Sequence, residues 1–166
     1  MTGEDSLREK AKQKAFRLLA VRARSERELK SKLKEKGFDE TVIGAVTERL
    51  RELRYLDDES FAEQWARNLG VNRLLGDRRI ILSLKEKGIP PPLIEQAITS
   101  LRSEVSETDA MRKLIRKKLK SQSIVILDAG EKGRLARNLM AKGFPADLIY
   151  RMLNESDDKE FVNDRD

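Results

Sequence analysis

Apolar residues recur along the chain at helical spacing, in segments that end at a phrase repeated three times. The phrase is an apolar residue, two mostly polar residues, Lys, Gly and a second apolar residue, and its copies cover residues 33–38, 84–89 and 139–144. Its glycines lie 51 and then 55 positions apart. A period of that length indicates a tandem repeat of about three helices.

The repeated phrase is typical of a helix end. Lysines in the last turn favour the negative end of the helix dipole, and a glycine just past the end adopts the left-handed conformation without a Cβ clash. The apolar residue that follows folds back on the last turn. We therefore predict that Gly37, Gly88 and Gly143 cap helices. A phosphate loop is excluded, because the glycines do not cluster and the GxxxxGK[ST] spacing is absent.

Three helices are predicted in the first repeat, residues 1–54, which includes a short polar extension at its start. Apolar residues three or four positions apart predict an amphipathic helix over about 7–24. Ser25 and Glu28 have the spacing of a capping box and open a second helix. Asp39 is placed to cap a third helix. The predicted inward face of that helix consists of Val42, Ile43, Val46, Leu50 and Leu53.

The second repeat, residues 55–103, opens on paired aspartates that are placed to cap a helix start. They belong to the motif Tyr55, Leu56, Asp57, Asp58. The helix that follows has an apolar stripe typical of core packing, made of Phe61, Ala62, Trp65, Ala66 and Leu69. We predict a joint over residues 70–76 and a second helix from Asp77. A third helix begins at the prolines 90–92, because proline is tolerated in the first turn.

The third repeat, residues 104–155, begins with a helix over about 105–120 whose polar side is strongly basic. The apolar run at 124–127 is ambiguous between a short strand and a packed loop; we favour the loop, because no second strand pattern exists to pair with it. Pro145 starts the last helix. Beyond Asn154 we expect weak order or disorder, with an acidic tail over residues 156–166.

Aligning the three glycines brings the apolar positions of the repeats into register. The matched sets are Leu29, Ile80 and Leu135, then Leu33, Leu84 and Leu139, then Ile43, Ile94 and Ile149. Low-complexity charged sequence would not keep that register. We therefore expect an all-α fold, an elongated and curved array of three tandem three-helix repeats, in which each repeat buries a small core.

Composition excludes several classes of function. The chain has neither cysteine nor histidine, which excludes disulfides, thiolate metal sites, His-based catalysis and most zinc sites. Asp57 and Asp58 are the only candidate carboxylate pair for acid–base catalysis. Capping explains them better, because the sequence shows neither a partner group of different pKa nor a nucleophile near them. We expect no enzymatic activity and no cofactor. No apolar run spans a membrane and no signal peptide is visible, so a cytoplasmic protein is expected. We also expect a monomer.

The charge of the chain is consistent with an acidic or polyanionic partner, and equally with a well-solvated helical surface. The net charge is +6, and without residues 151–166 it is +9. Repeat arrays often present a long concave binding face, and basic clusters occur in all three repeats. The candidate partner-binding residues are Arg22, Arg24, Arg27, Lys30, Arg67, Arg73, Arg78, Arg79, Lys85, Arg112, Arg116 and Lys117. A sequence-tolerant DNA-binding helical module remains an alternative on this basis.

From about Ala15 to Leu153 the chain resembles the RecX family of bacterial recombination regulators. The resemblance rests on residues 18–29, on Tyr55 to Asp58 followed by Phe61, and on 80–89, together with Gly76 before the middle helix of the second repeat. It implies three tandem three-helix repeats. It also implies binding to the RecA recombinase and modulation, usually inhibition, of its filament on single-stranded DNA. Members of the family are thought to lodge in the filament groove and bridge neighbouring subunits.

Overall fold

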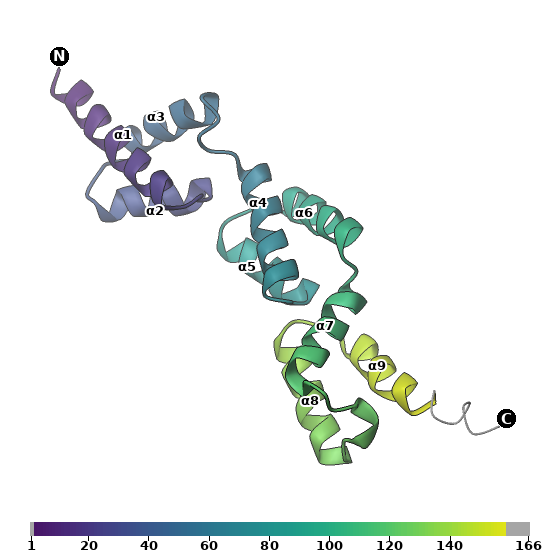
Figure 1. Cartoon of the computed structure of the whole chain (residues 1–166). Helices are drawn as coiled ribbons and strands as arrows, with labels where there is room; N and C mark the ends of the chain where they lie inside the picture. Colours follow the sequence, from purple (N-terminus) through teal and green to yellow (C-terminus); the bar gives the residue numbers. More distant parts are fainter. Residues whose placement is uncertain (1, 159–166) are drawn as a thin grey trace. The chain divides into compact units, whose positions relative to one another are not determined.

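The computed structural model describes residues 2–158, and its contacts group the chain into two compact units. The first unit consists of Met1–Trp65 and Leu84–Ala97, and the second of Ala66–Ser83 and Ile98–Asp166. Within residues 2–158 the secondary structure is entirely helical (Figure 1). The predicted all-α class is therefore confirmed.

The first repeat contains α1 (Gly3–Val21), α2 (Glu26–Glu35) and α3 (Glu40–Glu52). Both halves of the predicted capping box at Ser25 are present, and Asp39 caps α3 by accepting from the Val42 amide at 2.9 Å. Helix α1 starts earlier than predicted, because Thr2 forms a capping box of its own with Asp5. The core of the first repeat is made of Ala11, Ala15, Leu29, Leu33, Val42, Ile43, Val46, Leu50 and Leu56.

The assignment of Leu53 to the inward face of α3 is wrong. Helix α3 ends at Glu52, and Leu53 is its C-cap residue, 42% exposed. The next residue, Arg54, has a φ of +59°, which turns the chain out of the helix. Helical periodicity predicts an inward Leu53, but the helix ends one residue before it, so the side chain is not directed into the core.

The second repeat contains α4 (Asp58–Arg67), α5 (Asp77–Glu86) and α6 (Pro91–Glu104). Asp57 starts α4, since its carboxylate accepts from the Ser60 amide at 3.1 Å. Helix α4 continues into a π-helical turn, η1 (Asn68–Asn72), which the sequence pattern does not predict. The connection expected between α4 and α5 is thus partly helical. It includes the buried residue Leu74, which has a φ of +55°.

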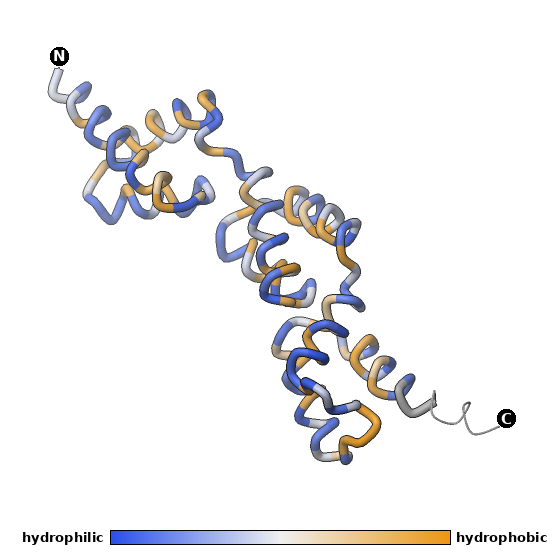
Figure 2. Tube along the Cα trace, in the orientation of Figure 1, coloured by the Kyte–Doolittle hydropathy of each residue, from blue (hydrophilic) through white to orange (hydrophobic). Residues whose placement is uncertain are grey.

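The third repeat contains α7 (Glu107–Leu119), a 3₁₀ turn η2 (Ile124–Ile126), α8 (Ala129–Ala141) and α9 (Ala146–Asp158). The apolar run at 124–127 forms this turn and not a strand, as favoured, but only Leu127 is buried and Ile126 is 65% exposed. Hydrophobic and hydrophilic residues alternate along these helices at helical spacing (Figure 2). The core consists of Leu74, Ala110, Met111, Leu114, Ile115, Leu127, Leu135, Ala136, Leu139, Phe144, Ile149, Met152 and Leu153.

The weak order expected beyond Asn154 stays a prediction. Helix α9 continues through Asp158, four residues past that point. Residues 159–166, most of the predicted acidic tail, lie outside the described part of the chain.

The repeated Lys-Gly phrase ends a helix in the same way each time. Gly37 has a φ of +88° and its amide donates to the Lys34 carbonyl at 2.9 Å, while the Phe38 amide donates to the Leu33 carbonyl at 3.3 Å. Gly88 and Gly143 repeat this double hydrogen bond, with φ values of +76° and +94°. All three are Schellman motifs, so the predicted capping role is confirmed.

Candidate interaction surface

The start of one middle helix docks on the glycine-capped end of the middle helix in the next repeat. At the first joint, between the first two repeats, the Ser25 hydroxyl donates to the Lys87 carbonyl at 2.6 Å. At the second joint, between the last two repeats, the Gly76 amide donates to the Lys142 carbonyl at 2.9 Å. The first joint lies within the first compact unit and the second within the other. The capped turns at Gly88 and Gly143 therefore also form the contacts that connect one repeat to the next.

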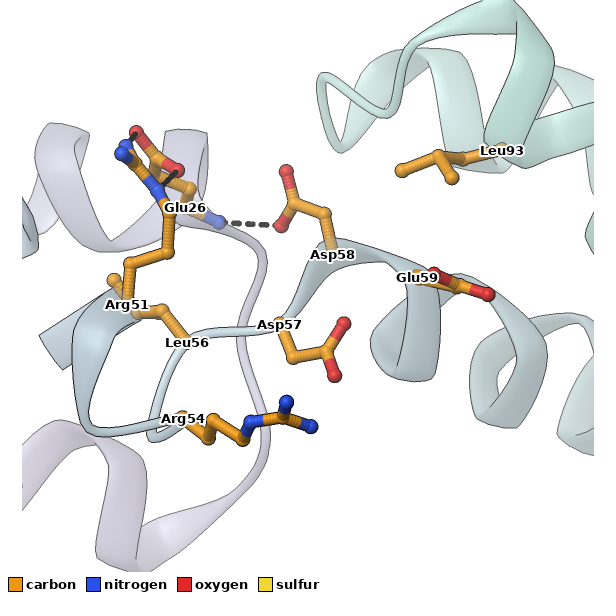
Figure 3. Close-up of a pocket in the computed structure, with 8 residues that line it drawn as sticks. All are labelled: Glu26, Arg51, Arg54, Leu56, Asp57, Asp58, Glu59 and Leu93. Atoms are coloured by element: carbon orange, nitrogen blue, oxygen red, sulfur yellow. Dashed lines mark hydrogen bonds and ion pairs between the residues drawn. The ribbon is translucent and has the colours of Figure 1, made fainter.

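An arginine and a carboxylate brace the helix start at each joint. At the first joint, Arg51 donates to Glu26 at 2.8 and 3.2 Å, and the Glu26 amide donates to Asp58 at 2.9 Å (Figure 3). The second joint has the same arrangement, with an Arg102–Asp77 pair at 2.7 Å and the Asp77 amide donating to Glu107 at 2.9 Å. In both joints the first helix of one repeat supplies a carboxylate that caps the middle helix of the previous repeat.

The paired aspartates line a cleft of about 340 Å³ on this side of the first joint (Figure 3). Burial raises the pKa of Asp58, although the hydrogen bond from the Glu26 amide acts in the opposite direction. Asp57 caps its own helix and Asp58 caps α2, so the two carboxylates do not converge on a common point. Among the described residues no acidic group of three or more could hold a metal ion.

Two basic residues of the first joint, Arg22 and Lys87, share one carboxylate. Glu28 accepts from Arg22 at 2.9 Å and from Lys87 at 2.6 Å, and its side chain is only 15% exposed. Burial alone would raise the pKa of Glu28, but the hydrogen bonds from Arg22 and Lys87 outweigh it and hold that pKa at about 2. The Lys87 ammonium also lies 5.0 Å from the centre of the Trp65 ring.

Replacing Glu28 with Gln is expected to destabilise the chain by about 2 kcal/mol at neutral pH and by far less near pH 2. The pKa of Glu28 is lower in the folded chain, so its stabilisation is complete above an unfolded pKa of 4.5 and is lost as the pH falls towards 2. Gln keeps the capping-box geometry, so the change removes the charge alone. Urea midpoints at a series of pH values, followed by Trp65 emission, measure the effect. A difference between the two proteins that does not vary with pH would contradict it.

The second joint carries a cleft of about 540 Å³ that is lined by cations without any carboxylate. Arg73 follows η1, Arg79 lies in the first turn of α5, Lys117 in the last turn of α7, and Lys142 caps α8. None of these four makes an ion pair with another residue in the part of the chain that the structure describes. Two amides and four apolar side chains complete the lining, namely Asn72, Asn138, Leu74, Leu75, Leu114 and Ala141. We call this the cationic cleft.

The register of the repeats explains why the two joints differ in charge. Fifty-one positions after Glu28 stands Arg79, and 55 positions after Lys87 stands Lys142. Arg22 of the first joint likewise corresponds to Arg73. The backbone arrangement is therefore kept, while the central carboxylate is exchanged for a guanidinium. No carboxylate among residues 2–158 forms an ion pair with the remaining cations.

The structure brings together three of the predicted partner-binding residues, Arg73, Arg79 and Lys117, in the cationic cleft. Arg22, Arg24 and Arg27 line a second cleft at the first joint, where the carboxylates of Glu28 and Glu86 also lie. Arg24 donates to the Leu18 carbonyl at 3.2 Å, and the methylenes of Arg27 pack over Gly88. These three contribute to the joint itself.

The remaining predicted residues lie outside both clefts. Lys30 pairs with Glu26 at 2.7 Å, Arg67 with Glu104 at 2.7 Å and Arg112 with Asp109 at 3.2 Å. Arg78, Lys85 and Arg116 are exposed. The prediction missed Lys142, Asn72 and Asn138. The glycine register would have indicated Lys142, since it matches Lys87, whereas no sequence signal places the two asparagines at the cleft.

Comparison with known proteins gives the family. The profiles of the first, second and third RecX three-helix domains match residues 11–50, 57–98 and 106–153. The chain belongs to the RecX family. A regulatory protein RecX from Mycolicibacterium smegmatis is 32% identical over 161 residues, covering 95% of this chain and 83% of the relative. One from Amycolatopsis mediterranei is 34% identical over 146 residues, covering 88% and 82%.

Solved RecX structures share the fold. The crystal structure of RecX from Lactobacillus salivarius superimposes with a TM-score of 0.77 at 24% identity, covering 92% of this chain and 98% of that one. A second RecX crystal structure gives a TM-score of 0.73, also at 24% identity, over 92% of this chain and 73% of the other. The RecX assignment and the tandem three-helix repeat predicted from the sequence are confirmed. No helix within residues 2–158 is long and apolar enough to cross a bilayer.

Proposed function

We propose that this RecX-family chain binds the RecA recombinase and its filament on single-stranded DNA, and that it inhibits filament growth, ATP hydrolysis and strand exchange. The observation that carries the proposal is the match of all three RecX domains, in order, over nearly the whole chain. Relatives named regulatory protein RecX support a regulatory role. RecA as the partner comes from the family resemblance.

The proposed mechanism is a shift between filament states. A protein that bridges neighbouring RecA subunits changes the filament only as far as it binds one state more tightly than another. A nucleoprotein filament offers negative charge from phosphates and from acidic side chains. The cationic cleft, with four unneutralised side chains at one joint, supports contact with such a surface. The first joint is less suited to it, because Glu28 occupies the equivalent central position.

Titration of the chain into RecA on single-stranded DNA tests the proposal. The rate of ATP hydrolysis is expected to fall to a plateau as the chain saturates the filament. In parallel, binding to the RecA filament and to bare DNA is compared at physiological salt, and the filament is expected to bind at least about tenfold more tightly. Equal affinity for both would favour the alternative, a sequence-tolerant DNA-binding module. An increased hydrolysis rate would contradict inhibition.

A further inference from the structure

We propose that the cationic cleft is a binding site for the phosphate groups of a nucleic acid strand, and that the first joint, built on the same backbone arrangement, is not. The inference rests on the proposed function only in taking the DNA of the filament as the source of those phosphates. Its test contains no RecA.

The cleft gathers its cations from four separate elements. Arg73, Arg79, Lys117 and Lys142 come from the end of η1, the start of α5, the end of α7 and the end of α8. Two guanidinium groups supply the planar, paired N–H donors that match phosphate oxygens, and two ammonium groups add point charges. The side chains of Asn72 and Asn138 also line the cleft, and the Asn72 amide donates to the Asn68 side chain at 2.9 Å. With no acid in the lining, every charged group favours an anion.

The apolar part of the lining strengthens the interaction of these cations with a bound anion. Leu74 and Leu114 are buried members of the third-repeat core, and Leu75 and Ala141 complete the apolar lining. Charge interactions beside an apolar surface are less screened than in open water. Leu74 holds a left-handed backbone conformation, φ +55°, directly after the π-helical turn. Both features are uncommon and are enriched at functional sites, and here they position Arg73 at the cleft.

The first joint indicates what the cleft lacks. There, Glu28 joins Arg22 and Lys87 with hydrogen bonds of 2.9 and 2.6 Å. At the second joint the corresponding cations are Arg73 and Lys142, and the position of Glu28 is taken by Arg79. A phosphate in the cleft supplies the negative charge that Glu28 supplies at the first joint. Phosphate binding should therefore also fasten the third repeat to the second, and stabilise the fold through linkage.

Fluorescence anisotropy with a short labelled oligothymidylate tests the site directly. Two neighbouring positions of one helix give a matched pair, because Lys117 lines the cleft and the exposed Lys118 does not. Lys117→Glu is expected to weaken binding about tenfold or more, and Lys118→Glu by no more than about twofold. The slope of log affinity against log salt, from roughly 50 to 200 mM, should fall by about 1 for Lys117→Glu. Equal losses in the two variants would overturn the site.

Arg79→Glu tests the comparison between the joints. It places a carboxylate beside Arg73 and Lys142 at the position that corresponds to Glu28. It should therefore abolish oligothymidylate binding while the fold remains at least as stable as the wild type. The oligothymidylate should raise the thermal midpoint of the wild type and leave that of Arg79→Glu unchanged. An Arg79→Glu variant that binds the strand normally would contradict the proposal.

Competition separates the sources of phosphate. If a strand is the ligand, ATP and inorganic phosphate displace the oligothymidylate only at concentrations that act through ionic strength. Displacement by micromolar ATP would instead assign the cleft to a free nucleotide and overturn the strand as ligand. A wild-type chain that inhibits RecA but binds no oligothymidylate would refute this inference and leave the proposed function standing.

Discussion

Gly143→Ala is expected to cost the chain about 3 kcal/mol of stability, against about 1 kcal/mol for Gly37→Ala. Both glycines have a left-handed backbone, with φ values of +94° and +88°, so both variants lose the conformational freedom that the helix end requires. They differ in their surroundings. A Cβ on Gly37 would meet nothing within 4 Å, whereas one on Gly143 would lie 2.5 Å from the Arg79 backbone nitrogen.

The clash of an added Cβ at Gly143 is costly because it is a clash between two backbone segments, and neither can move aside as a flexible side chain could. The start of α5 cannot withdraw from an added methyl without lengthening the hydrogen bond from the Gly76 amide to the Lys142 carbonyl. Gly76 faces the same restriction, since a Cβ there would overlap the Gly143 carbonyl group and lie 2.5 Å from the Phe144 nitrogen. Gly76→Ala should therefore lose stability without any positive-φ contribution.

Urea unfolding, followed by circular dichroism and by Trp65 emission, measures these effects. In a repeat array, weakening one interface lets the repeats unfold separately. The two signals should coincide for the wild type and for Gly37→Ala. They should separate for Gly143→Ala, because Trp65 reports on the first joint and the weakened contact lies at the second. Equal destabilisation by the two alanines would show that the joint contact contributes nothing.

The largest functional effect is expected from reversing Arg73, Arg78 and Arg79 to Glu together. The concentration of the chain that half-inhibits RecA ATP hydrolysis should rise about tenfold or more. Arg73 and Arg79 line the cationic cleft, and Arg78 is exposed beside it in sequence. All three side chains are exposed, so helicity measured by circular dichroism should remain that of the wild type.

A second triple variant controls for net charge. Arg8, Arg49 and Arg134 are exposed and line neither the cationic cleft nor the clefts of the first joint, and their reversal to Glu changes the charge by the same amount. This control should inhibit RecA nearly as well as the wild type. Full inhibition by the first triple variant would refute the assignment of function to the second joint. Similar losses in both variants would attribute the effect to overall charge instead.

Helix ends were predictable from the sequence because their signals are local. The Lys-Gly phrase, the capping box at Ser25 and the cap at Asp39 each act within a few residues, and all appear as predicted. The π-helical turn η1 and the exposure of Leu53 were not predictable in this way. Both depend on how the chain leaves a helix, which helical periodicity does not describe.

The candidate site was predicted only in part, because charge along a sequence does not reveal its partners. Arg67 is neutralised by Glu104, 37 residues later, and Lys87 by Glu28, 59 residues earlier. Counting basic residues therefore treats paired and unpaired cations alike. The exchange of Glu28 for Arg79 was present in the glycine register, but its meaning depends on knowing that α2 and α5 start at equivalent joints.

Because helix starts dock on capped turns, the two ends of the repeat array differ in how well they can accept a further repeat. The docking position holds the small, buried residues Ser25 and Gly76, while α8 of the third repeat starts after the exposed Asp128, whose carboxylate caps the helix. At the other end, the turn at Gly37 receives no helix among residues 2–158. A duplicated repeat placed ahead of the first would find a ready receptor there. One placed after the third would meet a bulky charge, so gene duplication could lengthen such an array more readily from its N-terminal side.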